Sequence, residues 1–109
     1  AGWTRSHGLL FYPSVGPGYD DTRIRPWNAA NTRPRQGSQY YDNMFQAAIN
    51  ANPTGITITS YNEWGEGTQI EPVNCAQPNA PDQGALKGFA FEKYPDDDPH
   101  FYLTRTAHW

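Results

Sequence analysis

A β-branched run followed at once by a carboxylate-rich segment is the feature that most constrains how this chain can fold. Residues 55–59 are Gly-Ile-Thr-Ile-Thr, and residues 60–71 then hold three glutamates, two aromatic residues and two glycines. The first stretch is expected to form a strand, because β-branched side chains fit a pleated surface. In α/β barrels the catalytic groups lie at the C-terminal ends of the strands, and this pattern resembles such an edge. A solvated acidic turn is the alternative, but Tyr61 and Trp64 would gain little in one.

A strand, a helix and a second strand are predicted in this order. Residues 9–15 form an apolar run, which we interpret as a buried parallel strand that ends near Pro13. Residues 38–52 predict a helix, which Ser38 can cap and Pro53 ends. Its apolar stripe, spaced i, i+3, i+4, i+7 and i+8, consists of Tyr41, Met44, Phe45, Ala48 and Ile49. With a strand over residues 56–62, the pattern predicts a βαβ unit with parallel strands.

The second strand should present two different faces, because side chains alternate along a strand. We expect Ile56 and Ile58 to face the helices. Thr57 and Thr59 would then point into a barrel, and Glu63 would lie at its mouth.

Residues 16–37 show no periodicity and predict a long loop. Long loops without regular structure are uncommon in compact domains and are often functional. Arg23 and Arg25 could donate hydrogen bonds to hydroxyls or carboxylates, and Trp27 could stack on a ligand. The alternative is a surface loop whose arginines form ion pairs with Asp20 and Asp21, and the sequence favours neither interpretation.

The remaining segments give weaker patterns. Residues 1–8 resemble the frayed end of a helix, residues 72–88 predict a second loop, and residues 89–91 a short extended piece. Residues 94–99 form a proline-bracketed acidic turn. Its aspartates suit a solvated helix N-terminus better than a calcium loop. Residues 100–109 are then expected to form a final helix.

Composition limits the possible partners of the chain. Aromatic residues make up 15% of it and the net charge is −3, which suits stacking on sugar rings better than contact with nucleic acid. No run approaches the roughly 20 apolar residues of a membrane span. Cys75 is the only cysteine, so no internal disulfide can form. No cluster of residues implies a metal or an organic cofactor.

Several separate motifs carry a family resemblance. Residues 62–71 are Asn-Glu-Trp-Gly-Glu-Gly-Thr-Gln-Ile-Glu, preceded by Pro-Ser-Val-Gly-Pro-Gly-Tyr at 13–19 and Ile-Arg-Pro-Trp-Asn at 24–28. Asn-Thr-Arg at 31–33 and Tyr-Leu-Thr-Arg at 102–105 complete the set. In this order the motifs resemble glycoside hydrolase family 99, the endo-α-mannosidases, over most of the chain.

The resemblance implies an α/β fold in which this chain is the C-terminal portion, about the last two strand–helix units, of a (β/α)8 TIM barrel. Residues 1–109 would then be a partial catalytic domain without an internal boundary, since such barrels typically need about 250 residues. It further implies cleavage of internal α-mannosidic bonds in N-glycans or mannans, with retention of configuration. The implied location is the secretory pathway (Golgi lumen) or the extracellular space.

The resemblance also implies roles for individual residues. Glu66 would be the general acid/base, and Glu63 would be a base on the 2-hydroxyl of the sugar, giving a 1,2-anhydro sugar. An acid must keep its proton near neutral pH, so we expect Glu66 to be buried. Only a turn at residues 64–65 could bring both carboxylates to one sugar, because positions i and i+3 of a strand face opposite ways. The candidate substrate-binding residues are Asn62, Trp64, Tyr19, Arg25 and Trp27.

Two positions need separate comment. Gly65 departs from the animal members, which often carry histidine there, and this leaves the contact of such a side chain open. Glu71 could be a third active-site carboxylate, but we expect it to order the loop.

Two other function classes fit the same residues. A self-standing carbohydrate-binding module would keep the aromatic residues and carboxylates without turnover, and it should fold alone. A structural interaction domain would tolerate the loss of both carboxylates, Glu63 and Glu66.

Overall fold

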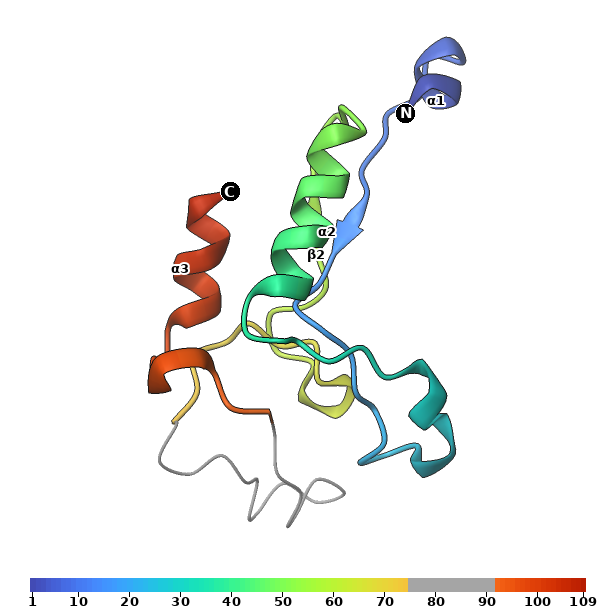
Figure 1. Ribbon diagram of the computed structural model, residues 1–109. Coiled ribbons are helices and arrows are strands. Elements are labelled where there is room, and N and C mark those ends of the chain that lie inside the picture. The colour runs from blue at the N-terminus through green and yellow to red at the C-terminus, as the bar shows by residue number, and fades with distance from the viewer. Residues whose placement is uncertain (75–91) are drawn as a thin grey trace.

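The computed structural model describes residues 1–74 and 92–109 as a small α/β unit, with its α-helices and strands in the upper part of Figure 1 and the long loops and short 3₁₀ helices below. In chain order its elements are α1 (Gly2–Ser6), β1 (Ser14–Val15), η1 (Pro26–Asn31), α2 (Gln39–Asn50), β2 (Thr57–Ile58), η2 (Trp64–Glu66), η4 (Pro95–Asp97) and α3 (Phe101–His108). Here η denotes a 3₁₀ helix.

The two strands confirm the predicted βαβ unit. β1 and β2 pair in parallel, with Ser14 opposite Thr57 and Val15 opposite Ile58, and α2 lies between them in the chain. Both strands are shorter than predicted. Pro13 has no amide hydrogen to donate, so β1 begins after it rather than ending near it.

The apolar run before β1 is not buried as predicted. The side chains of Leu9 and Leu10 are 53% and 70% exposed, and residues 9–13 form an extended arm that contributes no strand residue. The arm still lies along the chain that leads into β2, since the amide of Thr54 donates to the Phe11 carbonyl at 2.8 Å. The amide of Thr57 likewise donates to the Pro13 carbonyl at 3.0 Å.

Among the described residues, helix α2 supplies three of the seven buried hydrophobic ones, and they belong to the predicted apolar stripe. Tyr41, Phe45 and Ala48 are buried and Met44 packs against them, but Ile49 is 41% exposed. Ser38 occupies the N-cap position without a capping hydrogen bond from its side chain. The buried hydrophobic cluster joins α2 to both strands and to the C-terminal part; its members are Val15, Tyr41, Phe45, Ala48, Ile70, Tyr94 and Tyr102.

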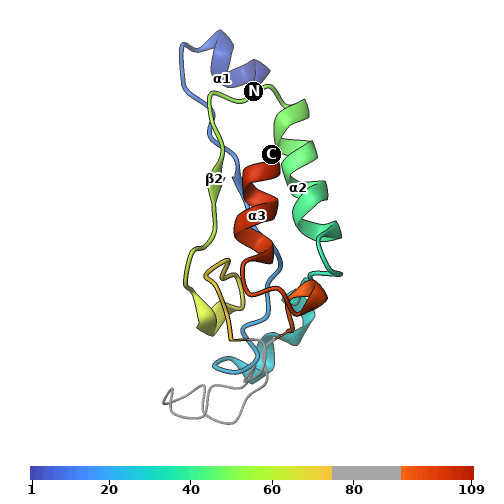
Figure 2. The ribbon, with the colours of Figure 1, turned by 90° about the vertical axis from the view of Figure 1, so that its left-hand side faces the viewer.

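The faces of the second strand agree with the expected alternation. Ile56 and Ile58 pack against the core cluster, whereas Thr57 and Thr59 are exposed. The final helix is present as α3, and Figures 1 and 2 show it alongside α2. One aspartate of the acidic turn binds the backbone at the N-terminus of α3: Asp98 Oδ1 accepts a hydrogen bond from the amide of His100 at 2.9 Å.

The loops after β1 and β2 lie together at the carboxyl ends of the strands, at the lower end of the molecule in Figure 1. Residues 16–37 are more ordered than predicted. They contain η1 and an antiparallel bridge between Tyr19 and Arg33. The first residues form the short helix α1, in line with the expected helix end.

Some sequence predictions concern residues outside the described ranges. Cys75, the extended piece at 89–91 and all but the first residues of the loop at 72–88 belong to this group. Among the described residues, no helix is long and apolar enough to cross a membrane.

Candidate active site

The loop of residues 60–71 closes on itself through hydrogen bonds at its base. The amide of Ser60 donates to the Thr68 carbonyl at 2.9 Å, and the two side-chain hydroxyls lie 2.7 Å apart. The Tyr61 carbonyl accepts from the amides of Ile70 (2.9 Å) and Glu71 (2.8 Å). The segment is therefore an Ω-shaped loop closed by hydrogen bonds, and not an open acidic turn.

The short helix η2 carries Glu66 and lies directly after Glu63. A turn at residues 64–65 was the condition for convergence of the two carboxylates, and η2 supplies it at Trp64–Glu66. A Cβ on Gly65 would lie 3.1 Å from Glu63 Oε1, so the Glu63 carboxylate lies against the turn that leads to Glu66. The chain can leave the turn because Gly67 has φ 64°, a left-handed conformation that glycine adopts without strain.

Asp21 is the centre of the other loop. It is fully buried, and it accepts hydrogen bonds from Tyr19 Oη at 2.8 Å, Arg25 Nη1 at 3.0 Å and Asn28 Nδ2 at 2.9 Å. Burial raises the pKa of the Asp21 carboxyl, but hydrogen bonds from Asn28, Arg25 and Tyr19 outweigh it, so the net pKa is lowered. The hydrogen bond to Asp21 in turn raises the pKa of the Tyr19 hydroxyl. Asp21 is thus a carboxylate that fixes Tyr19 and Arg25.

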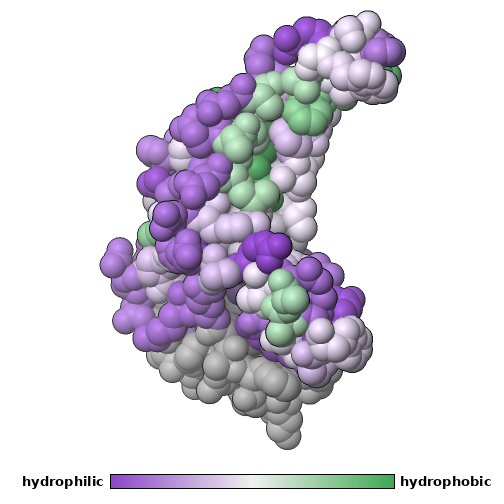
Figure 3. Space-filling model, turned by 45° about the vertical axis from the view of Figure 1, so that its right-hand side comes forward, coloured by the Kyte–Doolittle hydropathy of each residue, from purple (hydrophilic) through white to green (hydrophobic). Residues whose placement is uncertain are grey.

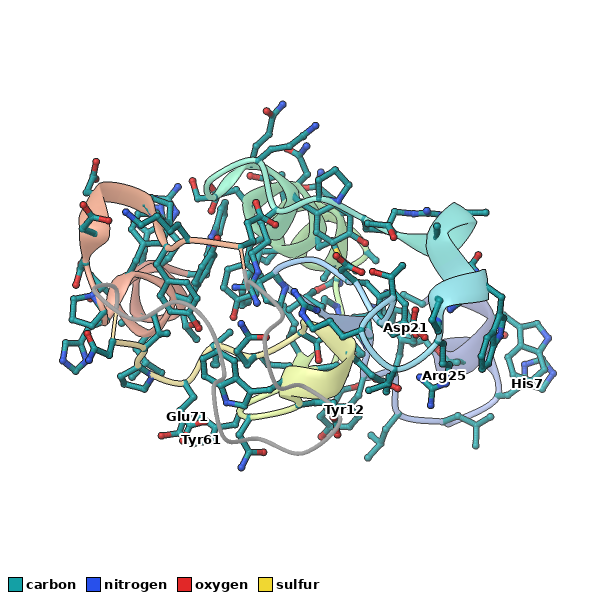
Figure 4. The ribbon with its side chains drawn as sticks, turned by 90° about the horizontal axis from the view of Figure 1, so that it is seen from below. His7, Tyr12, Asp21, Arg25, Tyr61 and Glu71 are labelled. Atoms are coloured by element: carbon teal, nitrogen blue, oxygen red, sulfur yellow. The ribbon has the colours of Figure 1, made fainter. Side chains whose placement is uncertain are left out.

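Arg25 joins this cluster to the glutamate loop. Its Nη1 lies 3.0 Å from Asp21 Oδ2 and 3.5 Å from Glu66 Oε1. The backbones also meet, because the amide of Asp20 donates to the Glu66 carbonyl at 2.9 Å. Figure 4 shows Asp21 and Arg25 side by side where the two loops meet. Both interpretations of the 16–37 loop therefore hold for Arg25, which forms a structural ion pair and also reaches a candidate catalytic residue.

Glu71 orders the loop, as expected. Its Oε2 accepts from Trp64 Nε1 at 2.7 Å, and its carbonyl accepts from Tyr94 Oη at 2.8 Å. The indole of Trp64 is thereby held in a defined orientation beside η2, which suits a ring that contacts a sugar.

Other expectations are met in part. Glu66 was expected to be buried, but its side chain is 34% exposed. Trp27 is 80% exposed on η1 and Asn62 is also exposed. Among the described residues, no hydrogen bond or ion pair joins either side chain to Glu63 or Glu66. The structure therefore brings Arg25 to Glu66. It holds Tyr19 on Asp21, which Arg25 also contacts, and orients Trp64 through Glu71. It does not fix the side chains of Trp27 and Asn62 on the two glutamates.

Asn28 is the site residue that sequence reasoning missed. It donates to both oxygens of Asp21. The only signal was its place in the motif at 24–28, since a lone asparagine in a loop is ordinary. Over the part of the chain that the structure describes, no group of three or more His, Cys, Asp or Glu residues could hold a metal ion.

The arrangement of strands, loops and carboxylates is typical of one class of protein. A parallel βαβ unit whose strand-end loop carries two glutamates beside an arginine and a fixed tryptophan is typical of an α/β glycosidase edge. A family model, "Glycosyl hydrolase family 99", matches residues 1–109. The chain therefore belongs to this family.

Individual relatives agree with the family assignment. The chain is 47% identical over 107 residues to a glycoprotein endo-alpha-1,2-mannosidase of Xenopus laevis. It is 58% identical over 107 residues to a glycoprotein endo-alpha-1,2-mannosidase-like protein of Mus musculus. Each match covers 95% of this chain and 21% of the relative, so the chain spans about a fifth of their length.

A solved structure shares the fold. The GH99 endo-alpha-mannosidase from Bacteroides thetaiotaomicron superposes with a TM-score of 0.84 at 47% identity. The match covers 99% of this chain and 29% of that structure.

Proposed function

We propose that this chain carries the acid/base pair of a retaining endo-α-mannosidase and forms about the last two strand–helix units of its (β/α)8 barrel. The main support is the junction of the two loops, where Arg25 contacts both the buried Asp21 and Glu66. Parallel β1 and β2, with both loops at their carboxyl ends, fit one sector of such a barrel. The full activity belongs to a complete barrel, of which this chain would be one part.

In the proposed first step, Glu63 removes the proton from the sugar 2-hydroxyl, and O2 attacks the anomeric carbon. The glycosidic C–O bond breaks as Glu66 donates its proton to the leaving oxygen, which gives a 1,2-anhydro sugar. In the second step Glu66 takes a proton from water, the water oxygen attacks the anomeric carbon, and the bond between that carbon and O2 breaks while O2 regains its proton from Glu63. Two inversions retain the configuration. This route replaces the direct attack of a carboxylate on the anomeric carbon.

The remaining contacts suit a neutral sugar. Trp64, fixed by Glu71, offers a ring face, and Tyr19 lies beside Arg25 through their common partner Asp21. Trp27 and Asn62 complete the proposed sugar contacts from the exposed rims of the two loops. The proposed substrate is an α-mannoside oligosaccharide, either an N-glycan or a mannan, met in the Golgi lumen or outside the cell.

Substitution of each glutamate in the complete enzyme tests the proposal. Glu66→Gln and Glu63→Gln should each lower kcat on the order of 1,000-fold, because an amide can neither donate nor accept the required proton. Substrate binding should change little. Asp96→Asn is the matched control, since Asp96 is an exposed acid on η4. Wild-type turnover in Glu66→Gln would remove that residue from its role.

A carbohydrate-binding module is the second candidate function. The observation in its favour is the exposure of aromatic rings beside the site, 80% for Trp27 and 54% for Tyr61. Such a module would bind α-mannosides as an isolated chain and would keep that affinity in Glu63→Gln and Glu66→Gln. Isothermal titration of the isolated chain with mannose oligosaccharides separates the two functions.

A further inference from the structure

Arg35 is a buried arginine that lies behind the glutamate loop. Only 2% of it is exposed, although arginine is rarely buried to this degree without a charged partner. No ion pair with its guanidinium is found among the described residues. Its surroundings therefore have to explain why an arginine stands there.

The guanidinium binds the backbone of the returning arm of the loop. Arg35 Nη2 donates to the carbonyl oxygens of Gly67 at 3.0 Å and Gln69 at 2.8 Å. These carbonyls flank Thr68, whose backbone and hydroxyl close the loop onto Ser60. Arg35 thus holds the chain directly after Glu66, at the position where the loop is closed.

Two tyrosines hold the guanidinium in place. Its central carbon lies 4.5 Å from the ring centroid of Tyr102 and 5.4 Å from that of Tyr94. Tyr94 also binds the loop itself through its hydroxyl, which donates to the Glu71 carbonyl at 2.8 Å. Tyr102 is fixed in turn, because its hydroxyl donates to the Gly37 carbonyl at 2.7 Å. The positive charge is therefore compensated by aromatic faces and carbonyl dipoles.

A lysine could not reproduce this arrangement. Its single ammonium group is a compact, strongly hydrated charge, whereas the planar guanidinium can stack on a ring and direct hydrogen bonds in its plane at the same time. Loss of those bonds would leave the Gly67 carbonyl buried without its donor among the described residues, and would leave the Gln69 carbonyl with the longer bond from Tyr94 Oη at 3.3 Å.

We propose that Arg35 is a positioning residue: it fixes the loop that carries Glu63 and Glu66 from its buried side, through the carbonyls of Gly67 and Gln69. Its catalytic consequence rests on the proposed function, but its structural consequence does not. The inference extends the site from the two loops to the aromatic core, since Tyr94 and Tyr102 hold Arg35 and belong to the buried cluster.

The test compares Arg35→Lys with Arg33→Lys in the complete enzyme. Arg33 is exposed and its Nη1 donates only to neighbouring carbonyls, those of Ala30 and Thr32. We expect Arg35→Lys to lower kcat on the order of 100-fold, the cost of a misplacement of about 1 Å, with KM changed less than about threefold. Arg33→Lys should match the wild type in both constants.

Hydrogen–deuterium exchange gives a readout that needs no activity. In Arg35→Lys the amides of residues 60–71 should exchange at least about tenfold faster, while those of α2 keep their rate. If this variant does not fold, Tyr94→Phe replaces it. The variant keeps the ring and loses the hydroxyl bonds to the carbonyls of Glu71 (2.8 Å) and Gln69 (3.3 Å), the second of which also accepts from Arg35, so both effects should persist in weaker form.

The outcomes separate the two proposals. Unchanged kcat and unchanged exchange of the loop in Arg35→Lys, or in Tyr94→Phe when it replaces that variant, would overturn the positioning role. Faster exchange of the loop in a protein without mannosidase activity would support the role of Arg35 and reject the proposed function.

Discussion

Gly67 shows how a single residue sets the direction of the glutamate loop. Its φ of 64° is unfavourable for other residues, and a Cβ there would lie 2.9 Å from the Asp20 carbonyl oxygen. Gly67→Ala should therefore lower the free energy of unfolding by more than the roughly 1–2 kcal/mol of left-handed strain. Gly8→Ala is the matched control, because Gly8 has φ 66° with open space around it. Equal losses in urea unfolding would show that the contact with Asp20 costs nothing.

Asp21 makes the stability of the site depend on pH. Burial raises the pKa of the Asp21 carboxyl, but hydrogen bonds from Asn28, Arg25 and Tyr19 lower it by more, so the pKa in the folded state is below the ordinary value. The stabilisation is therefore fully present above the unfolded pKa of about 3.9 and is lost as pH falls through the lower folded value. Asp21→Asn should lower stability at pH 7 and reduce the loss of stability on acidification. The measurement is the free energy of unfolding of both proteins at several pH values from 7 to 3. The same loss of stability in variant and wild type over this range would contradict the prediction.

At the scale of elements, α3 is attached to α2 through the hydroxyls of Tyr41 and Thr106, which lie 2.8 Å apart, and through Asp42. Arg105 binds both of its oxygens, at 2.6 and 2.8 Å, and Trp109 Nε1 donates to Oδ1 at 3.0 Å. The ring of Trp109 also stacks on Phe45, with centroids 5.7 Å apart. The attachment therefore combines a two-bond ion pair with an aromatic contact.

Arg105→Lys should loosen this attachment. A lysine cannot form both bonds of the planar fork, so we expect a loss of about 1 kcal/mol for this partly exposed pair. Arg5→Lys is the control, because Arg5 is exposed and its guanidinium donates, within the described residues, to the Asn52 carbonyl alone. The effect is measured as the free energy of unfolding of both variants and as the rate of amide exchange in α3, which should be faster in Arg105→Lys. A greater loss in Arg5→Lys would contradict the attachment through Asp42.

The elements were predictable where a local pattern encodes them. The stripe from Tyr41 to Ala48 identifies α2, because a helix buries positions three and four apart. The strands were overestimated, since an apolar run such as Leu9–Leu10 does not reveal whether another element covers it. At Asp21, the ion pair with Arg25 was one of the two interpretations that the sequence left open, but the burial of the carboxylate and its bonds from Tyr19 and Asn28 were not predictable, because a loop has no periodicity. The role of Arg35 was not predictable because its partners, Gly67 and Gln69, lie more than 30 positions away in another loop.

At the scale of the whole molecule, the chain is extended and leaves apolar surface open. Its radius of gyration is 15.6 Å, compared with about 13 Å for a compact domain of this length. Figure 3 shows hydrophobic residues gathered along the upper part of the molecule. A groove of about 490 Å³ runs between α2 and the arm before β1; its lining includes Phe11, Val15, Met44, Ala47 and Ala48.

This surface follows from the proposed barrel. A two-stranded sheet is marginal in water on its own, and β1 and β2 each pair only with the other among the described residues. In a barrel, the neighbouring strand–helix units would cover the groove and the exposed Leu9 and Leu10. The half-exposed Glu66 would likewise be enclosed by loops from the other strands, which would provide the burial that its proton requires.

The isolated 109-residue chain should therefore be inactive and loosely folded. We expect no α-mannosidase turnover, a broad thermal transition and strong binding of a hydrophobic dye, because the groove and both strand edges are open to water. Co-expression with the rest of a family 99 barrel should give turnover, and Glu66→Gln in the 109-residue piece should abolish it. Leu10→Ser in that piece removes an exposed apolar side chain away from the glutamates. It should reduce dye binding by the isolated chain and weaken assembly, without changing kcat per assembled enzyme. A sharp cooperative transition together with mannoside binding by the isolated chain would instead establish the carbohydrate-binding module, since only a self-sufficient domain could show both.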